Sequence, residues 1–229
     1  MEIIAHVHTP FAEKFGVPRQ SGLVEAEGQV VFTPPYRSAD AVRGLEGFSH
    51  LWLLWEFHQM ADLPWSPTVR PPRLGGNQRM GVFATRSPHR PNPIGLSCVR
   101  LSGVELTAEG PVLHISGADL VDGTPIYDIK PYIPYCDSHP EAVGGWTDSV
   151  ESALLTVEFP EDLLSAVPEE DRQGLLGVLA QDPRPRYQND RSRVYGLRYG
   201  SVNVKFSVAG DKLTVAEIKN AECRMQNAK

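Results

Sequence analysis

FSHLWLLWEFH, residues 48–58, is the stretch that decides the fold of this chain. Side chains along a β-strand point alternately to the two faces of its sheet. Taken with that period, one face is wholly apolar and consists of Leu51, Leu53, Trp55 and Phe57. The other face mixes aromatic, acidic and imidazole groups and consists of His50, Trp52, Leu54, Glu56 and His58. We therefore predict a strand with one face in a core and the other in a ligand cleft or a subunit interface.

Similar short β-type runs lie on both sides of this strand, separated by proline and glycine. They occupy residues 3–7, 29–32, 80–85, 96–101 and 112–116. A further run follows the Asp122-Gly123 turn and carries on one face Ile126, Asp128, Lys130 and Tyr132. About seven short strands without a convincing helix are typical of a β-barrel or a β-sandwich. We expect residues 1–140 to form this mainly β domain.

The composition shifts around residues 140–150, where Gly144 and Gly145 indicate a domain boundary. Beyond it, residues 154–159 are a candidate strand, and residues 168–180 a candidate helix with acidic residues in its first turn. Residues 194–199, 202–208 and 213–218 have the pattern of an antiparallel meander. Residues 151–229 are therefore predicted to form a smaller α+β domain.

The overall composition is that of an ordinary globular protein, with 229 residues, 41% hydrophobic residues, 22% charged residues and a formal net charge of -6. No apolar run is long enough to span a bilayer and no signal peptide is recognisable, so we expect a cytoplasmic protein without a membrane partner. Cys98, Cys136 and Cys223 lack Cys-x-x-Cys spacing, and no His-Glu-x-x-His pair occurs. We expect neither a disulfide framework nor a metal site.

Residues 70–100, RPPRLGGNQRMGVFATRSPHRPNPIGLSCVR, reverse the sign of the charge over a long stretch. Six arginines lie in it, and no Asp or Glu occurs between Asp62 and Glu105. Interleaved prolines and glycines predict a rigid, irregular loop system around the short strand at 80–85. Solvated arginines are one explanation, but their number favours a site for phosphate or another anion.

A second basic region covers residues 183–205, which hold six cations and a single acid, Asp190. Tyr187, Tyr195 and Tyr199 are interleaved with these cations. Cationic groups for phosphates and aromatic faces for bases are typical of RNA and single-strand binding. A solvated strand face is the alternative explanation.

These segments together resemble the TsaA-like proteins, whose best-understood members are the TrmO tRNA methyltransferases. The matching motifs are PRQ at 18–20, DAVRGLEGFSHLWLLWEFHQ at 40–59, RPPRLGGNQRMGVFATRSPHRPNPIGLS at 70–97, DLVDGTPIYDIKPYIPY at 119–135 and QDPRPRY at 181–187. The resemblance implies a small single-sheet β-barrel instead of the Rossmann methyltransferase fold. It also implies a homodimeric, S-adenosylmethionine-dependent enzyme that methylates N6 of threonylcarbamoyl-adenosine next to the anticodon of threonine tRNA.

The resemblance assigns cofactor contacts to this sequence position by position. They are Pro18, Arg19, Gln20, His58, Gln59, Arg86, Leu96, Asp119, Leu120, Val121 and Asp122. An arginine can pair with the methionyl carboxylate, an aspartate can bind the ribose hydroxyls or the ammonium, and Leu96 can offer adenine an apolar wall. The cofactor rests on the resemblance alone, because no strand-linked G-x-G-x-x-G fingerprint is present.

The acceptor nitrogen of such a substrate is poorly nucleophilic and must lose a proton around methyl transfer, so a nearby base would help. The candidates for this role are Asp122, Tyr127 and His58. The side chains expected near RNA are Arg70, Arg73, Arg79, Arg90, Arg184, Arg186 and Tyr187. Two other classes of function stay open, namely a non-enzymatic module that binds S-adenosylmethionine or RNA and a hydrolase that uses the His and Asp residues.

Overall fold

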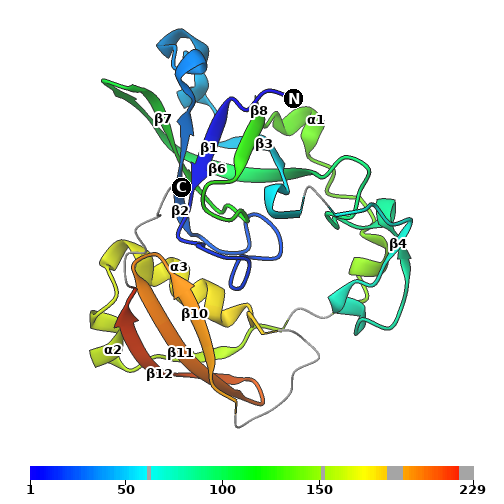
Figure 1. Cartoon of the computed structure of the whole chain (residues 1–229), viewed down its shortest axis with the longest axis vertical. Helices are drawn as coiled ribbons and strands as arrows, with labels where there is room; N and C mark the ends of the chain where they lie inside the picture. Colours follow the sequence, from blue (N-terminus) through cyan, green and yellow to red (C-terminus); the bar gives the residue numbers. More distant parts are fainter. Residues whose placement is uncertain (61–62, 151–152, 185–192, 222–229) are drawn as a thin grey trace.

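A computed structural model describes residues 1–60, 63–150, 153–184 and 193–221 (Figure 1). Most of the first part of the chain forms a closed barrel of antiparallel strands. Around the barrel the strands are β1 (Ala5–His8), β2 (Glu27–Phe32), β7 (Gly110–Ser116), β6 (Ile94–Thr107), β3 (His50–Glu56) and β8 (Pro125–Pro131). The prediction of a small single-sheet β-barrel is confirmed, and the sandwich alternative is excluded.

Strand β3 lies between β6 and β8 and supplies much of the barrel interior. Leu51 and Leu53 are fully buried, Trp55 is buried, and Phe57 packs against the same core. Trp52 and Leu54 point outward and are partly exposed. The predicted alternation of β3 is confirmed, because every second side chain meets the closed barrel interior.

Short turns and one long loop connect the barrel strands. Between β2 and β3 are the 3-10 turns η1 (Pro34–Tyr36), η2 (Ala39–Val42) and η3 (Leu45–Gly47). After β8 come the single-turn helix α1 (Pro134–Asp137) and the turn η7 (Gly145–Thr147). Strand β6 is longer than predicted, because a register shift between Leu101 and Gly103 lets it continue along β7.

The loop from β3 to β6 builds an irregular lobe beside the barrel, on the right in Figure 1. We call residues 63–93 the arginine lobe. It contains β4 (Thr68–Val69), η5 (Pro72–Leu74), β5 (Met80–Gly81) and η6 (Val82–Ala84), and it follows η4 (His58–Met60). The predicted strand at 80–85 is wrong, because only Met80 and Gly81 pair and a 3-10 turn follows. The two-residue hairpin has no third strand to extend it.

The C-terminal part is a four-stranded sheet in the order β10-β11-β12-β9, with helices against it (Figure 1). Its elements are β9 (Thr156–Glu158), α2 (Glu161–Ser165), α3 (Glu169–Ala180), β10 (Tyr195–Tyr199), β11 (Val202–Ala209) and β12 (Lys212–Asn220). Helix α3 buries Leu175, Val178 and Leu179. The predicted helix and the β10–β12 meander are confirmed.

The loop between β1 and β2 belongs to both halves of the molecule. Its residues Phe11, Val24 and Ala26 are buried in the core that α3 and the C-terminal sheet form. The rings of Phe11 and Tyr199 meet edge to face, with centroids 5.7 Å apart. This packing anchors the predicted cofactor motif at residues 18–20, which lies in the same loop. No helix among the described residues is long and apolar enough to cross a bilayer.

Candidate active site

Loops from distant parts of the chain meet at one end of the barrel, on the side of the C-terminal sheet. The backbone N–H of Cys98 donates to Ser21 Oγ at 3.1 Å, and that of Gly22 to the Gly117 carbonyl at 2.8 Å. The N–H of Phe57 donates to the Pro93 carbonyl at 2.9 Å. These bonds connect the motif at residues 18–20, the end of β3, the strand β6 and the loop at 117–124. The sequence had predicted cofactor contacts in each of these segments.

Asp119 is the partly buried carboxylate of this site, and a chain of hydrogen bonds fixes it. Ser97 Oγ donates to Asp119 Oδ1 at 2.5 Å and accepts from Trp55 Nε1 at 2.9 Å. Burial raises the pKa of Asp119, while the Ser97 hydrogen bond and the charge of Arg86 oppose that rise. Ser97 is 1% exposed and was not among the predicted site residues. The only sequence feature that could have identified Ser97 is its position next to the predicted Leu96, on the opposite face of the same strand.

Arg86 supplies the positive charge of the site. Its side chain is exposed, and Nη1 donates a hydrogen bond to Gln20 Oε1. Gln20 Nε2 in turn donates to the carbonyl of Arg19, whose guanidinium donates to the Asp182 carbonyl at 3.0 Å. The charge of Arg86, which precedes β6, also acts on the carboxylate of Asp119, which lies between β7 and β8. A ligand with both an anionic and a cationic group requires such a pair.

Asp122 lies in the exposed turn that precedes β8. Its backbone N–H donates to the Phe11 carbonyl at 2.8 Å, and Oδ1 accepts from the Thr9 N–H at 3.2 Å. The Nδ1 atom of His8 lies 3.2 Å from the same oxygen. His8 was missed by the sequence analysis, because 114 positions separate the two residues and only barrel closure brings them together. The His8-Thr9-Pro10 breaker at the end of β1 was its only signal.

The other two candidates for a base lie in different surroundings. Burial and a hydrogen bond with Glu56 raise the pKa of Tyr127 to about 12, so its phenol is neutral near pH 7. His58 is partly buried in η4. Within the described chain, no hydrogen bond or ion pair joins any two of Asp122, Tyr127 and His58.

The remaining predicted cofactor residues differ in exposure. Pro18 and Leu120 are buried, Val121 is partly buried, and Gln59 is exposed. Leu96 is 50% exposed on the outer surface of the barrel, where it pairs with Leu54. The structure brings Arg19, Gln20, Arg86 and Asp119 together. Among the described residues it shows no hydrogen bond from Gln20, Arg86 or Asp119 to His58, Gln59 or Asp122, and it leaves Leu96 on the other face of β6 from Ser97.

The arginines predicted near RNA fall into two groups. Arg70 and Arg79 are exposed, whereas Arg73 is partly buried. Arg90 Nη1 donates to the Thr85 carbonyl at 2.6 Å and to the Val82 carbonyl at 3.2 Å, so it also holds the lobe together. Arg184 pairs with Asp182 at 2.8 Å, and its side chain is 10% exposed. Arg186 and Tyr187 lie outside the described residues.

Two tyrosines of the second basic region do not present faces to a ligand. Tyr195 is 6% exposed and Tyr199 is 1% exposed, because both pack into the C-terminal core. The expectation that their rings are available for bases is therefore wrong. Strand alternation places them inward, and the one cation between them, Arg198, on the other face of β10, where it is partly exposed.

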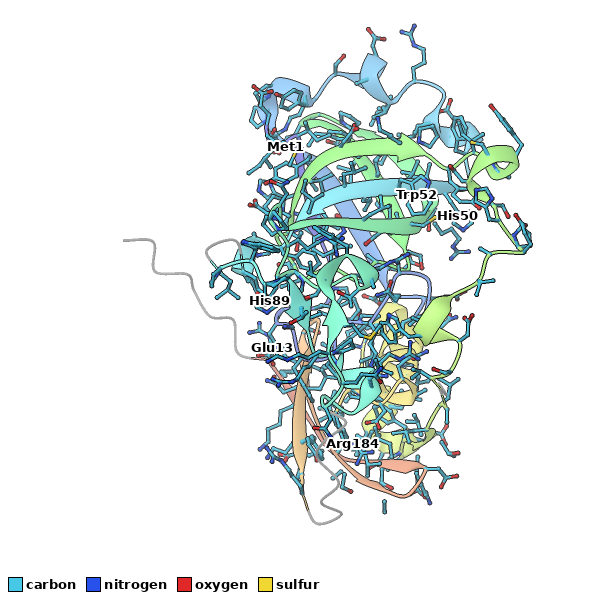
Figure 2. All side chains as sticks on the ribbon, turned by 90° about the vertical axis from the view of Figure 1, so that its right-hand side faces the viewer. Met1, Glu13, His50, Trp52, His89 and Arg184 are labelled. Carbon is cyan, nitrogen blue, oxygen red and sulfur yellow. The ribbon has the colours of Figure 1, made fainter. Side chains whose placement is uncertain are left out.

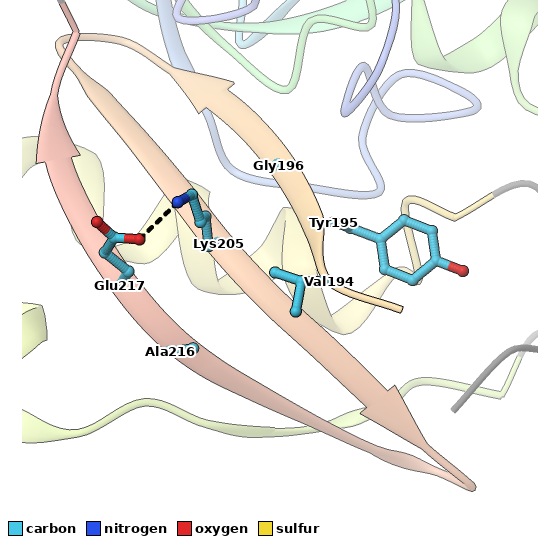
Figure 3. A pocket seen from close by; sticks show the side chains of 6 residues that line it. All are labelled: Val194, Tyr195, Gly196, Lys205, Ala216 and Glu217. Carbon is cyan, nitrogen blue, oxygen red and sulfur yellow. Dashed lines mark ion pairs between the residues drawn. The ribbon is translucent and has the colours of Figure 1, made fainter. Parts of the chain in front are cut away.

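The C-terminal sheet carries a hollow of about 620 Å³ (Figure 3). Its lining residues are Val194, Tyr195, Gly196, Lys205, Ala216 and Glu217. The ammonium of Lys205 is 2.7 Å from a carboxylate oxygen of Glu217, so the cation of this hollow is already neutralised. The hollow lies on the C-terminal sheet, whereas Asp119 and Arg86 lie in loops next to barrel strands, and we do not assign the hollow to the active site. Among the described residues no group of three or more His, Cys, Asp and Glu could hold a metal ion.

Comparison with known proteins identifies the family to which the chain belongs. Two family models match, described as the tRNA-methyltransferase O N-terminal domain over residues 6–138 and the TrmO C-terminal domain over residues 152–221. Over 216 residues the chain is 46% identical to the tRNA (adenine(37)-N6)-methyltransferase of Escherichia coli (strain K12), covering 90% of this chain and 92% of that protein. A probable S-adenosyl-L-methionine-binding protein of Pyrococcus abyssi is 38% identical over 148 residues, 63% of this chain and 74% of that protein.

The fold agrees with these matches. The crystal structure of TrmO from Pseudomonas aeruginosa has a TM-score of 0.76 to this structure and 36% sequence identity, and the superposition covers 95% of this chain and 97% of that one. The barrel and its charged loops thus define a methyltransferase of the tRNA-modifying, non-Rossmann class. The chain belongs to the TrmO family. The resemblance stated from the sequence is confirmed.

Proposed function

We propose that this protein transfers a methyl group from S-adenosylmethionine to N6 of threonylcarbamoyl-adenosine next to the anticodon of threonine tRNA. The observation that carries this proposal is the convergence of Arg86, Gln20 and Asp119 at the barrel end. The names of the Escherichia coli and Pyrococcus abyssi relatives support the reaction and the cofactor respectively.

The side chains at the barrel end fit the amino-acid end of this cofactor. Arg86 offers a guanidinium to the carboxylate, and Asp119 offers a carboxylate to the ammonium or to the ribose hydroxyls. The cofactor, when bound, supplies a methyl group on a sulfonium that needs no further activation. We expect the remaining contacts from the loops at 18–20, 58–59 and 119–122, which the hydrogen bonds above hold in place.

Asp122 is the group we propose to accept the proton of the acceptor nitrogen. It is exposed, and its Oδ1 accepts a hydrogen bond from the Thr9 N–H with the His8 imidazole at 3.2 Å, so the orientation of the carboxylate is fixed. Tyr127 is less suited to this role, because a phenol with a pKa of about 12 keeps its proton near neutral pH. His58 stays a candidate.

The proposal extends to the partners of the protein. We infer a cytoplasmic homodimer in which the outer face of β3, with Trp52 and Leu54, contributes to the subunit contact. Residues 1–140 would carry the cofactor and the reaction, and residues 151–229 would contact tRNA. The separate family matches to residues 6–138 and 152–221 support this division.

The decisive measurement is methyl transfer from radiolabelled S-adenosylmethionine to threonine tRNA, with and without the threonylcarbamoyl modification. Incorporation into the modified tRNA alone supports both the reaction and the substrate. Incorporation into the unmodified tRNA as well would contradict the substrate assignment. Cofactor binding without incorporation into either tRNA would favour the non-enzymatic binding module instead.

A further inference from the structure

The arginine lobe leaves large aromatic rings in solvent. Phe83 is 73% exposed and Trp65 is 53% exposed, whereas the neighbouring Val82 is 1% exposed and anchors the lobe. Exposed apolar groups that gather in one region of a protein mark interaction sites. The lobe faces the reader in Figure 2, where His89 is labelled.

Hydrogen bonds hold the two segments that carry these rings side by side. The N–H of Ser66 donates to the His89 carbonyl at 3.1 Å, and the N–H of Val82 donates to the Pro67 carbonyl at 3.0 Å. Trp65 and Phe83 are each next to one of these donors in the chain. They are therefore carried by one connected framework, although 17 intervening residues separate them.

Arg90 supports the exposed ring of Phe83. Its guanidinium carbon lies 5.6 Å from the ring centroid, and Nη1 is held by the Val82 and Thr85 carbonyls. On the other side of Phe83 in the chain, the Ala84 carbonyl accepts a hydrogen bond of 2.8 Å from Trp146 Nε1. Both contacts restrict the η6 turn, so an incoming flat group would meet a ring whose position is already set.

The hairpin beside these rings concentrates positive charge. Thr68 pairs with Gly81 and Val69 with Met80, and the same register continued by one residue would set Arg70 opposite Arg79. Like charges that face each other across strands are destabilising. Within the part of the chain that the structure describes, neither arginine has a carboxylate partner. An anion between them would relieve the repulsion.

We propose that the arginine lobe binds an unpaired stretch of RNA, with bases stacked on Phe83 and Trp65 and phosphates at Arg70 and Arg79. Exposed aromatic faces beside cations suit single strands, because a base can stack on a side chain only when it is free of its own helix. The inference rests on the proposed function, in which the substrate adenosine lies in an anticodon loop. It assigns the recognition of that loop to this lobe.

The test is the affinity of four variants for a labelled anticodon stem-loop RNA of threonine tRNA, measured by fluorescence anisotropy over a range of salt concentrations. Phe83→Ala and Trp65→Ala are each expected to weaken binding by about tenfold and to keep the salt dependence. The double variant Arg70→Gln/Arg79→Gln is expected to flatten the slope of log affinity against log salt by about 0.7 for each lost phosphate contact. Tyr135→Ala, an aromatic side chain on α1 that is 89% exposed, is the control and should bind as the unmodified protein does.

Stem-loops with single abasic loop positions test the stacking directly. Removing the base that stacks on Phe83 is expected to weaken RNA binding by the unmodified protein about tenfold. The Phe83→Ala variant should bind this abasic RNA as tightly as it binds the complete RNA. Equal affinities of Phe83→Ala, Trp65→Ala and the unmodified protein would overturn the proposal. An equal loss of affinity for a fully paired duplex would do the same.

The molar mass of each variant in solution separates RNA binding from contact between copies of this chain. If Phe83→Ala or Trp65→Ala lowers the RNA affinity only when it also changes the molar mass of the protein in solution, the rings belong to a contact between copies of the chain. The proposal is then wrong. If the stacking results hold but the unmodified protein transfers no methyl group, the proposed function fails while RNA binding by the lobe stands.

Discussion

The Ser97 hydroxyl donates a hydrogen bond of 2.5 Å to Oδ1 of Asp119, and it does so from inside the barrel. Ser97 Oγ also accepts a hydrogen bond from Nε1 of Trp55, which lies on the neighbouring strand β3. An indole of the barrel core is thereby connected to a carboxylate at the barrel end. The core of this protein, and not a surface loop, orients the acidic group of the candidate active site.

Replacing Ser97 by alanine should reduce both stability and cofactor affinity. The change leaves Trp55 Nε1 and Asp119 Oδ1 without their partner, and an unsatisfied buried group costs about 1–3 kcal/mol. Urea denaturation measures the free energy of unfolding, and titration calorimetry measures the dissociation constant of S-adenosylmethionine. We expect the second to rise because the carboxylate loses its fixed orientation.

Ser116→Ala is the matched control for that change. Ser116 is as buried as Ser97, but its hydroxyl has no hydrogen-bond partner in the described structure. Its replacement should leave the free energy of unfolding and the cofactor affinity close to their original values. A loss of the same size in both variants would mean that Ser97 only fills space.

Gly95→Ala should disturb the same hydrogen-bonded chain from the side. A Cβ atom at position 95 would lie 2.2 Å from Cε2 of Trp55, so the indole must move. Overpacking of this kind costs about 1–3 kcal/mol. Gly103→Ala on the same strand is the control, because nothing lies within 4 Å of its Cβ position. Thermal unfolding measures the midpoint temperature of both variants. Equal decreases in the two midpoints would contradict the packing argument.

The pH dependence of stability should report the burial of Asp119. A carboxyl with a raised pKa binds its proton more tightly in the folded protein than in the unfolded one, so its contribution to the free energy of unfolding falls as pH rises through that range. The substitution Asp119→Asn removes the titrating carboxyl and with it this decrease in the free energy of unfolding. Its stability relative to the original protein should therefore increase between about pH 3 and about pH 7 in urea denaturation.

Glu217→Gln should give the opposite slope. Hydrogen bonds with Lys205 and Lys219 lower the pKa of Glu217 to about 2. The stabilisation from this carboxylate is present above its unfolded pKa and is lost as pH falls toward about 2. Relative to the original protein, this variant should become less stable as pH rises over the same range. Slopes of the same sign for the two variants would contradict at least one of these two predictions.

Asp122→Asn should lower kcat by about 10²–10⁴-fold if the carboxylate accepts the proton of the acceptor nitrogen. The cofactor dissociation constant should change much less, because the substitution keeps the shape of the side chain. Asp128→Asn is the control. Asp128 lies in β8, the strand that follows the Asp122 turn, and its carboxylate pairs with the Lys130 ammonium at 2.9 Å. Single-turnover methyl transfer separates this effect from tRNA binding. An unchanged rate for Asp122→Asn would direct attention to His58.

Much of the fold was predictable because its signals are local. The alternation of Leu51, Leu53 and Trp55 identified β3, and the turn at Asp122-Gly123 correctly preceded β8. The same kind of reasoning failed at residues 80–85, where β-forming residues have no neighbouring strand to pair with and turn after Gly81. Residues with high strand propensity form a strand only when another strand is close enough to pair with them.

The amino-acid pattern alone predicted most of the barrel strands, the helix α3 and the family, and it predicts an anionic ligand for the arginines. Which charged groups act together became evident only from the folded chain. Barrel closure sets His8 beside Asp122, burial turns Tyr195 and Tyr199 inward, and internal hydrogen bonds give Arg90 a structural role. The reason is physical: periodicity and turn chemistry are written in neighbouring residues, whereas the partners of a polar group depend on loops that meet only after the chain has closed on itself.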